Sequence, residues 1–296
     1  MSPLVSVCVP TYNGDRYVER TVRSALEQTL TDLEVIVSDD GSVDATLDVV
    51  RTIDDARVRI VTNPGAGGAS SNWNHAVSLA RGNYVKVLCQ DDELYPECLA
   101  RQVDAMERGR ADHVVLVGCR RDIVDDRDRV IHARRGWSGA PTVASGAAVA
   151  RASVRAGTNV VGEPSSTLFR RDALDRIGGF AADQAYMIDL DAWTRMLQHG
   201  TLAYVQDALC TFRVSSNSWS ARLAREQARQ ARSTLQAIKA RYPDAVSAGD
   251  VRIGSLRALA LAYVRRVVFA LSSWLPERGR SGQRRPGPAR PSPDVV

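Results

Sequence analysis

Short β-branched segments alternate with amphipathic helical segments through the first hundred residues. The strand-like segments are Val5–Val9, Glu34–Val37, Val58–Val61 and Tyr84–Leu88. Helical periodicity covers Tyr17–Glu27, Thr46–Ile53 and Asn72–Ala80, and a further helix is expected from Pro96 to about Met106. This alternation predicts an α/β fold with a mostly parallel sheet flanked by helices. A chain of 296 residues can bury its core without a disulfide or metal staple.

The rest of the chain is less regular. Further strands are expected at His113–Val117, Ser165–Phe169, Leu202–Val205 and Cys210–Val214, with a charged hairpin over Asp122–His132 and a helix over Asp189–Gln198. Gly136–Ala148 is rich in Gly, Ser and Ala, which predicts a loop or a mobile lid. We expect a catalytic domain over 1–215, divided near 110, then a helical extension over 216–275 with helices at Trp219–Arg241 and Val251–Leu275. The Pro-, Gly- and Arg-rich tail 276–296 is expected to be disordered.

Composition excludes several classes of protein. The five cysteines are scattered and form no CxxC pair, so neither a disulfide framework nor a zinc site is predicted. The first residues lack the features of a signal peptide, and no apolar run reaches about 20 residues, so we expect a cytoplasmic protein. The net charge of +5 arises partly in the tail, which argues against a nucleic-acid partner.

Two acid pairs follow predicted strands. Asp39–Asp40 comes after the second strand and Asp91–Asp92 after the fourth. Ligands of open parallel sheets bind beyond the carboxyl ends of the strands, and crowded carboxylates repel one another unless a cation or ligand offsets them. One pair could simply cap a helix, whereas two favour a Mg²⁺ or Mn²⁺ ion held together with substrate phosphates. Gly65–Ser70 does not match GxGxxG and follows the wrong strand, and no Walker sequence is present, which disfavours dinucleotide and P-loop chemistry.

Several motifs, in order and at matching spacing, resemble those of family-2 glycosyltransferases. They are Val5–Asn13 (VSVCVPTYN), Val37–Asp44 (VSDDGSVD), Asn63–Asn74 and Leu88–Asp92 (LCQDD), followed by an acceptor-side stretch from Glu163 to Phe180 and a catalytic helix at Asp189–Arg195. The resemblance implies a GT-A fold and transfer of a sugar, with inversion, from a nucleotide diphosphate donor. The implied acceptor is a hydroxyl of a glycan, a lipid-linked molecule or a small molecule.

The resemblance also implies roles for donor-side residues. Pro10, Thr11, Tyr12 and Asn13 match the loop that borders the nucleotide, and Asp39 matches the acid that accepts the imide N–H of the base, which favours UDP or dTDP. Asp40 would contact the ribose or order the loop, Asp91 would lie near the ribose or sugar, and Asp92 would ligate Mn²⁺ or Mg²⁺. Arg213 would assist the phosphates, with a surface salt bridge as the alternative. The chain departs from the family pattern at Cys89, where many members carry an acid, and at Ser215, where His is common.

Inverting transfer needs one general base. Asp189 and Asp191 are the candidates, and because residues two apart on a helix are separated by about 200°, both cannot face one cleft from within it. The motif favours Asp189, and helix capping remains the alternative for either acid. On the acceptor side the resemblance points to Glu163, Ser165 and Trp193, although a helical Trp is also typical of a core.

The predicted helix Val251–Leu275 combines apolar residues with arginines. An interfacial helix on the inner face of the cell membrane would have this pattern, and so would a helix packed on the catalytic domain or in a homodimer. Two other functions stay open at this point. One is a nucleotidyltransferase or sugar-nucleotide pyrophosphorylase, and the other is a non-catalytic nucleotide- or glycan-binding domain.

Overall fold

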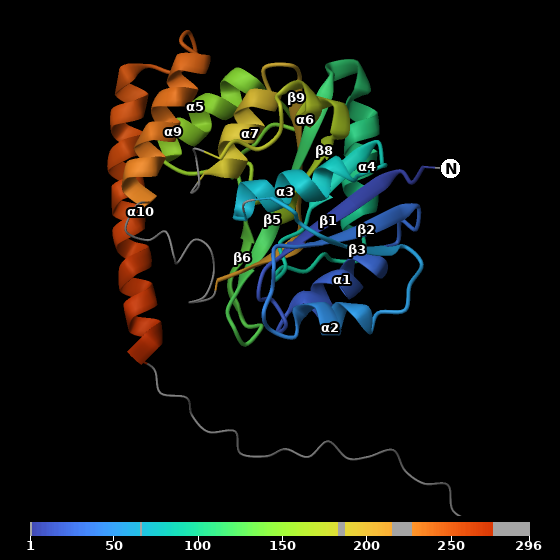
Figure 1. Cartoon of the computed structure of the whole chain (residues 1–296). Coiled ribbons are helices and arrows are strands. Elements are labelled where there is room, and N and C mark those ends of the chain that lie inside the picture. The colour runs from blue at the N-terminus through green and yellow to red at the C-terminus, as the bar shows by residue number, and fades with distance from the viewer. Residues whose placement is uncertain (1, 66, 183–186, 215–226, 275–296) are drawn as a thin grey trace, which may run out of the picture.

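The computed structural model describes residues 2–65, 67–182, 187–214 and 227–274. Its first half contains four parallel strands: β1 (Val5–Thr11), β2 (Leu33–Asp39), β3 (Val58–Thr62) and β4 (Tyr84–Val87). They lie in the order β3-β2-β1-β4, so the first strand of the chain is central and has a parallel partner on each side (Figure 1). The carboxyl ends of β1, β2 and β4 therefore meet at one edge.

Helices cover both faces of these strands. They are α1 (Val18–Leu26), α2 (Thr46–Arg51), α3 (Ala69–Ser78) and α4 (Cys98–Arg108). Every residue of β1 is buried, and alternate side chains enter different cores. Val7 packs in the same core as Val22 of α1 and Leu99 of α4, whereas Cys8 packs in the core that contains Ala76 of α3. Burial on both faces explains the nearly continuous apolar sequence of β1, and it confirms the predicted α/β layering.

The sheet continues from β4 into the second half of the chain. The added strands are β5 (Val114–Val124), β6 (Val130–Arg135), β7 (Val143–Ser145), β8 (Thr167–Arg170) and β9 (Thr201–Arg213). Strand β8 runs antiparallel to both β4 and β5, while β5 and β9 are parallel. The helices here are η1 (Gly109–Asp112), α5 (Gly146–Ala156), η2 (Pro164–Ser166), α6 (Arg171–Arg176) and α7 (Ile188–Met196). One sheet thus joins the two halves of the chain.

The second half differs in detail from its prediction. The charged hairpin is confirmed, since Ile123 of β5 pairs with His132 of β6. The predicted loop or lid at Gly136–Ala148 instead contains β7 and the start of α5, where the Ser145 hydroxyl accepts a hydrogen bond from the Ala148 amide at 3.3 Å. The two predicted strands Leu202–Val205 and Cys210–Val214 belong to the single strand β9, whose register against β5 shifts between them and interrupts the apolar alternation.

Two long helices follow the sheet. They are α9 (Gln227–Arg241) and α10 (Ala248–Trp274), and both pack on α5 (Figure 1). A Cβ added at Gly254 of α10 would lie 1.8 Å from the Val154 carbonyl oxygen of α5, so glycine permits this close crossing. The predicted helix start at Trp219, Ser215 and the tail 276–296 lie outside the described residues. None of the helices in the described ranges combines the length and the apolarity needed to cross a membrane.

Candidate active site

The loop after β1 is fastened to the end of β4. Gln90, which follows β4, accepts a hydrogen bond from the Tyr12 amide at 2.8 Å and donates one to the Tyr12 carbonyl oxygen at 3.1 Å. Pro10 and Thr11 are buried inside β1, whereas Tyr12 is 44% exposed. Of these predicted nucleotide-bordering residues, Tyr12 therefore offers its side chain to a ligand, and the other two support it from within the sheet.

Asp39, at the end of β2, is a buried loop anchor. Its carboxylate accepts hydrogen bonds from the amides of Gly41 (3.1 Å) and Ser42 (2.9 Å) and from the Ser42 hydroxyl (2.5 Å), and the residue is 1% exposed. Asn13 joins the same loop, because its amide donates to the Ser42 hydroxyl at 2.9 Å and its side-chain oxygen accepts from the Val43 amide at 2.9 Å. This geometry does not favour the predicted contact between Asp39 and a base, because these donors already occupy the carboxylate.

Asp40 is the more accessible acid of this pair. It is half-buried, and its carboxylate accepts one hydrogen bond from the Asn63 side chain and one from the Gly68 amide, both at 2.7 Å. Two lone pairs remain on its oxygens. The predicted loop-ordering role is consistent with these contacts, and capacity for a ligand remains.

The second acid pair divides in the same way. Asp92 is fully buried, and its two oxygens accept from the Ser165 hydroxyl at 2.5 Å and the Arg213 amide at 2.8 Å. Burial, followed by the charge of Asp91, raises the pKa of Asp92 well above its ordinary value. Asp91 is half-buried, and no side chain in the described part of the chain donates a hydrogen bond to its carboxylate. Ser165 is 1% exposed and anchors Asp92, so the prediction that it lines an acceptor groove is not supported.

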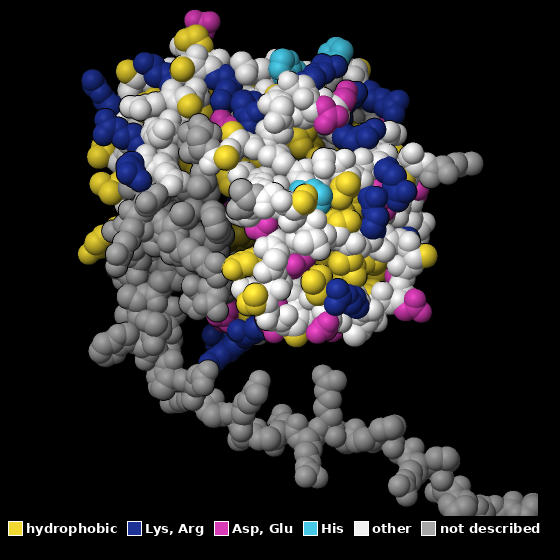
Figure 2. All heavy atoms as spheres, viewed as in Figure 1, with side chains coloured by type: hydrophobic (Ala, Val, Ile, Leu, Met, Phe, Trp, Pro, Cys, Tyr) yellow, Lys and Arg dark blue, Asp and Glu magenta, His cyan; other side chains and the backbone are white. Residues whose placement is uncertain are grey.

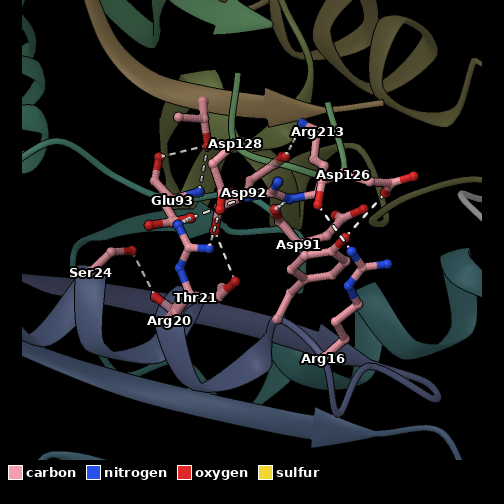
Figure 3. A network of polar contacts seen from close by, with 12 residues as sticks. Arg16, Arg20, Thr21, Ser24, Asp91, Asp92, Glu93, Asp126, Asp128 and Arg213 are labelled. Carbon is pink, nitrogen blue, oxygen red and sulfur yellow. Dashed lines mark hydrogen bonds and ion pairs between the residues drawn. The ribbon is translucent and has the colours of Figure 1, made fainter. Parts of the chain in front are cut away.

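Arg213 contacts the turn that carries Asp91, Asp92 and Glu93 (Figure 3). Its guanidinium carbon lies 4.4 Å from the centroid of the Tyr17 ring, and the side chain is 1% exposed. The guanidinium donates hydrogen bonds to the backbone carbonyl oxygens of Asp91 (3.0 Å) and Asp125 (2.7 Å). It also forms ion pairs with the carboxylates of Glu93 (3.2 Å) and Asp128 (2.7 Å). With its donors engaged and no surface exposed, Arg213 neither reaches a phosphate nor forms a surface salt bridge. Both predicted roles are replaced by a buried structural one.

The two acids of α7 face different surroundings. Asp191 is 4% exposed, and its carboxylate forms ion pairs with Arg195 at 2.7 Å and with Arg241 of α9 at 2.9 Å. These contacts fasten α7 to α9 and leave Asp191 no access to a ligand. The structure therefore does not favour Asp191 as an alternative base.

Asp189 is half-buried and accepts hydrogen bonds from the Asn159 side chain at 2.8 Å and the Leu190 amide at 2.7 Å. Burial raises its pKa from 3.8 to about 6, an effect that the Asn159 hydrogen bond opposes and the nearby charge of Glu163 increases. A carboxylate with a near-neutral pKa, held only by donors, can accept a proton.

Trp193 belongs to the core. It is 0% exposed, its ring lies 5.6 Å from that of Phe169 and 6.1 Å from that of Phe180, and its indole N–H donates to the Gly162 carbonyl oxygen at 3.1 Å. Stacking on an acceptor sugar is excluded by this burial. Glu163 keeps a partly exposed side chain and pairs with buried Arg121 at 2.5 Å.

The acids from separate stretches of chain lie within electrostatic range of one another. Burial raises the pKa of the Cys89 thiol well above its usual value, and the charges of Asp92, Asp91 and Asp189 raise it further. Glu163 raises the pKa of both Asp92 and Asp189. The predicted metal, sugar and base residues therefore lie close to one another, and the protonated Cys89 thiol lies among them.

Three residues with a part in this site were not predicted: Gln90, Asn159 and Arg121. Gln90 carried a local signal, because it stands inside the acidic motif directly after a strand. Asn159 and Arg121 carried none, since each reaches the site through contacts with residues 30 or more positions away.

The described surface also has two cavities, of about 130 and 490 Å³, at the amino ends of β4 and β5. Both are lined by Arg110, Arg170 and Asp172, and these two arginines already pair with acids, at 2.5 Å for Arg110 with Glu107 and 2.8 Å for Arg170 with Asp172. They lie at the edge of the sheet opposite to the acids, so the acid cluster remains the candidate active site.

Comparison with known proteins identifies the family. A family model described as "Glycosyl transferase family 2" matches residues 6–178. The chondroitin synthase of Pasteurella multocida (strain Pm70) is 46% identical over 99 residues, which are 33% of this chain and 10% of that protein. The chain thus matches about a tenth of the length of this relative.

Solved structures share the fold. S. aureus TarS 1–349 in complex with UDP-GlcNAc aligns with a TM-score of 0.65 and 18% identity, over 91% of this chain and 73% of that one. The mannosyltransferase PcManGT from Pyrobaculum calidifontis, in complex with GDP-Man and Mn²⁺, aligns with a TM-score of 0.57 and 22% identity, over 92% and 80%. These likenesses confirm the expected GT-A fold, and the family match confirms the expected enzyme class. The chain belongs to glycosyl transferase family 2.

Proposed function

We propose that this protein transfers a sugar, with inversion, from a nucleotide diphosphate donor to an acceptor hydroxyl, and that Asp189 is the general base. The observation that carries the proposal is the state of Asp189: a half-buried carboxylate, held only by donors, with a pKa of about 6. A base works best when its pKa lies near the working pH. One displacement with one base suffices for inversion, and Asp191 is withheld by its two arginines.

On the donor side, the contacts support Asp91 rather than Asp92 as the ligand of the divalent cation. Carboxylate oxygens are the ligands that Mg²⁺ and Mn²⁺ prefer, and the carboxylate of Asp91 is the one that no side chain in the described ranges occupies. The buried oxygens of Asp92 already accept hydrogen bonds from Ser165 and Arg213. A bound cation would neutralise the charge on the leaving diphosphate.

For the nucleotide, Asp40 and Tyr12 are the best-placed residues. Asp40 keeps free lone pairs that could accept the imide N–H of uracil or thymine, which favours UDP or dTDP. The exposed Tyr12 ring could stack on the base. Since TarS was solved with UDP-GlcNAc and PcManGT with GDP-Man, a thermal stabilisation screen of UDP-, dTDP- and GDP-sugars with Mn²⁺ is the direct test.

The cation assignment is tested with a pair of matched variants. We expect Asp91→Asn to fold, with no loss of melting temperature, but to lose Mn²⁺-dependent UDP binding, because burial already raises the pKa of Asp91 to about 6 and the neutral amide avoids the cost of a buried charge. Asp92→Asn should instead lower the melting temperature, because the amide presents a donor to one of two existing donors. Binding of Mn²⁺ with UDP is measured by electron paramagnetic resonance. If Asp92→Asn folds normally and abolishes binding while Asp91→Asn retains it, the cation belongs to Asp92.

The catalytic assignment is tested by turnover. Asp189→Asn should still bind donor and cation but reduce transfer or donor hydrolysis by about 10² or more. Asp191→Asn is the comparison variant: it removes the buried acid of the same helix, so it should lower the melting temperature through its weakened arginine pairs, while the folded protein keeps its turnover. If the wild-type protein binds donor yet hydrolyses and transfers none, it is a non-catalytic nucleotide-binding domain.

Helix α10 supports a membrane-proximal, lipid-linked acceptor. Its inward face is small, with Gly254, Ala258 and Ala262 buried, while its outward face exposes large apolar residues. These are Ile253 (39%), Leu256 (69%), Leu259 (57%) and Tyr263 (69%). Apolar and arginine side chains follow one another along the described part of this edge in Figure 2, and the sequence has no acid from 251 to 274. An apolar face bordered by arginines suits an anionic lipid surface.

Liposome co-sedimentation tests this contact. The wild-type protein should sediment with vesicles that contain phosphatidylglycerol and much less with phosphatidylcholine alone, and Leu256→Asp should weaken sedimentation. Val43→Asp is the control, because Val43 is 88% exposed on the sheet domain. Equal sedimentation of wild type and Leu256→Asp, together with a dimer that Leu256→Asp dissociates, would assign the face to a homodimer instead.

A further inference from the structure

The proposed base is held by a side chain for which the reaction above has no role. Asn159 lies between α5 and η2, and its side-chain nitrogen donates two hydrogen bonds at 2.8 Å, one to the Asp189 carboxylate and one to the Gly162 carbonyl oxygen. Asp189 is the second residue of α7, and the hydrogen bond from Asn159 links its carboxylate to the loop between α5 and η2.

The orientation of the Asn159 amide is fixed by the loop itself. Its side-chain oxygen accepts from the amides of Val161 at 3.0 Å and Gly162 at 3.2 Å. Because backbone N–H groups can only donate, the oxygen must face them and the nitrogen must face Asp189. The Gly162 carbonyl oxygen also accepts from the Trp193 indole at 3.1 Å, so a core residue one helical turn beyond Asp189 holds the other end of the loop.

The loop conformation requires glycine at 162. Gly162 has a φ of +125°, and an added Cβ would lie 2.1 Å from the Ser166 hydroxyl oxygen. Few other residues adopt such a φ without strain. The sequence therefore specifies a rigid turn that carries the Asn159 amide to the base.

Both partners of the Asp189 carboxylate are donors, namely the Asn159 amide and the Leu190 backbone N–H. Donors of this kind favour the ionised carboxylate and restrict its rotation. The charged groups that act on it are Glu163 and Arg121, and the neutral but titratable Cys89 thiol lies within electrostatic range of it. Glu163 opposes ionisation of Asp189, and Arg121 favours it while pairing with Glu163 at 2.5 Å.

We propose that Asn159 is a positioning residue, which holds the Asp189 carboxylate ionised and aimed at the acceptor hydroxyl. The proposal rests on Asp189 being the general base. The side chain of Asn159 is engaged by Asp189 and by the backbone of Val161 and Gly162, so it acts through the carboxylate.

The test is the pH profile of two variants. Asn159→Asp is nearly isosteric and keeps an oxygen for the Val161 and Gly162 amides, but it replaces the donor to Asp189 by a second carboxylate oxygen. Asn159→Ala removes the contact altogether. Hydrolysis of the UDP-sugar that best stabilises the protein, with Mn²⁺, is followed by release of UDP. We expect the acid limb of kcat/KM to move up by roughly one pH unit or more in both variants, with the larger shift in Asn159→Asp. At a pH above the limb, kcat should fall about tenfold with KM for the donor unchanged.

Asn74→Ala is the matched control, since the Asn74 amide bridges the backbone N–H and carbonyl of Phe180 at 2.8 Å each and lies outside the site. Its acid limb should coincide with that of the wild type. If the Asn159→Asp protein folds and the acid limb of its kcat/KM profile coincides with that of the wild type, the positioning role is overturned. Should Asn159→Ala not fold, the result for Asn159→Asp decides by itself. Full activity of Asp189→Asn would instead remove the base assignment, so the two failures are distinguishable.

Discussion

Replacing Asp189 by Asn should change how the stability of the protein depends on pH. Burial raises the pKa of this carboxyl from 3.8 to about 6, so the folded protein binds the proton more tightly than the unfolded chain does. Folding stability therefore falls as pH rises through this window. With 1.36 kcal/mol for each pKa unit, linkage between pH 4 and pH 7 amounts to about 2 kcal/mol. The Asn side chain does not titrate, so the variant is spared this loss.

The measurement is urea unfolding at pH 4, 5, 6 and 7 for both proteins. The Asn side chain also presents an N–H donor to Asn159 or Leu190, which are themselves donors, and this lowers the stability of the variant by the same amount at every pH. The effect cancels when the difference in stability between the two proteins is compared at different pH values. Relative to wild type, Asp189→Asn should gain about 2 kcal/mol between pH 4 and pH 7. Asp48→Asn is the control, because Asp48 is an exposed carboxylate of α2. Parallel curves for wild type and Asp189→Asn would refute the raised pKa, and with it the physical basis for the base.

Two further substitutions test the supports of the site. Arg213→Met should lower the free energy of unfolding by about 3 kcal/mol, measured by urea denaturation, because Glu93 and two carbonyl oxygens lose a buried partner. Gly162→Ala should lower it by about 2 kcal/mol or more, through its φ of +125° and the clash with Ser166, and kcat should fall with it. An unchanged melting temperature in either variant contradicts the role described for that residue.

The parallel half of the sheet could be predicted because its sequence signal is local. β1 is buried on both faces, so five apolar or small residues in a row at Val5–Val9 indicate a central strand without knowledge of its neighbours. The β7–α5 region could not be predicted in this way. Its Gly, Ser and Ala residues look like a loop in sequence, whereas in the fold their small size permits close packing, as at Gly146, where a Cβ would lie 2.2 Å from the Leu197 carbonyl oxygen.

The site was predictable as a set of positions but not as a set of roles. That acids follow β2 and β4 is visible in the sequence, and so is their convergence at one sheet edge. The hydrogen-bond donors that occupy the Asp92 carboxylate are not visible in the sequence, because Ser165 is 73 residues away and the Arg213 amide is 121 residues away. The predicted acceptor-side role of Trp193 was wrong for the same reason, since the burial of this residue depends on Phe169 and Phe180 rather than on its own helix.

Each acid pair has one buried and one half-buried member. On α7 the two acids are two residues apart and so separated by about 200°, whereas Asp39 and Asp40 lie at the end of β2 and Asp91 and Asp92 in the turn after β4. One acid of each pair is directed into the protein, where an ionised carboxylate is costly unless donors surround it. The fold supplies those donors from other segments of the chain, so the buried acid links its own segment to the segments that carry the donors. Its neighbour is left half-buried, with the capacity to bind a ligand. The buried members are Asp39, Asp92 and Asp191, and the half-buried members are Asp40, Asp91 and Asp189. Substitutions in the first set should thus act on folding and those in the second on donor binding and turnover.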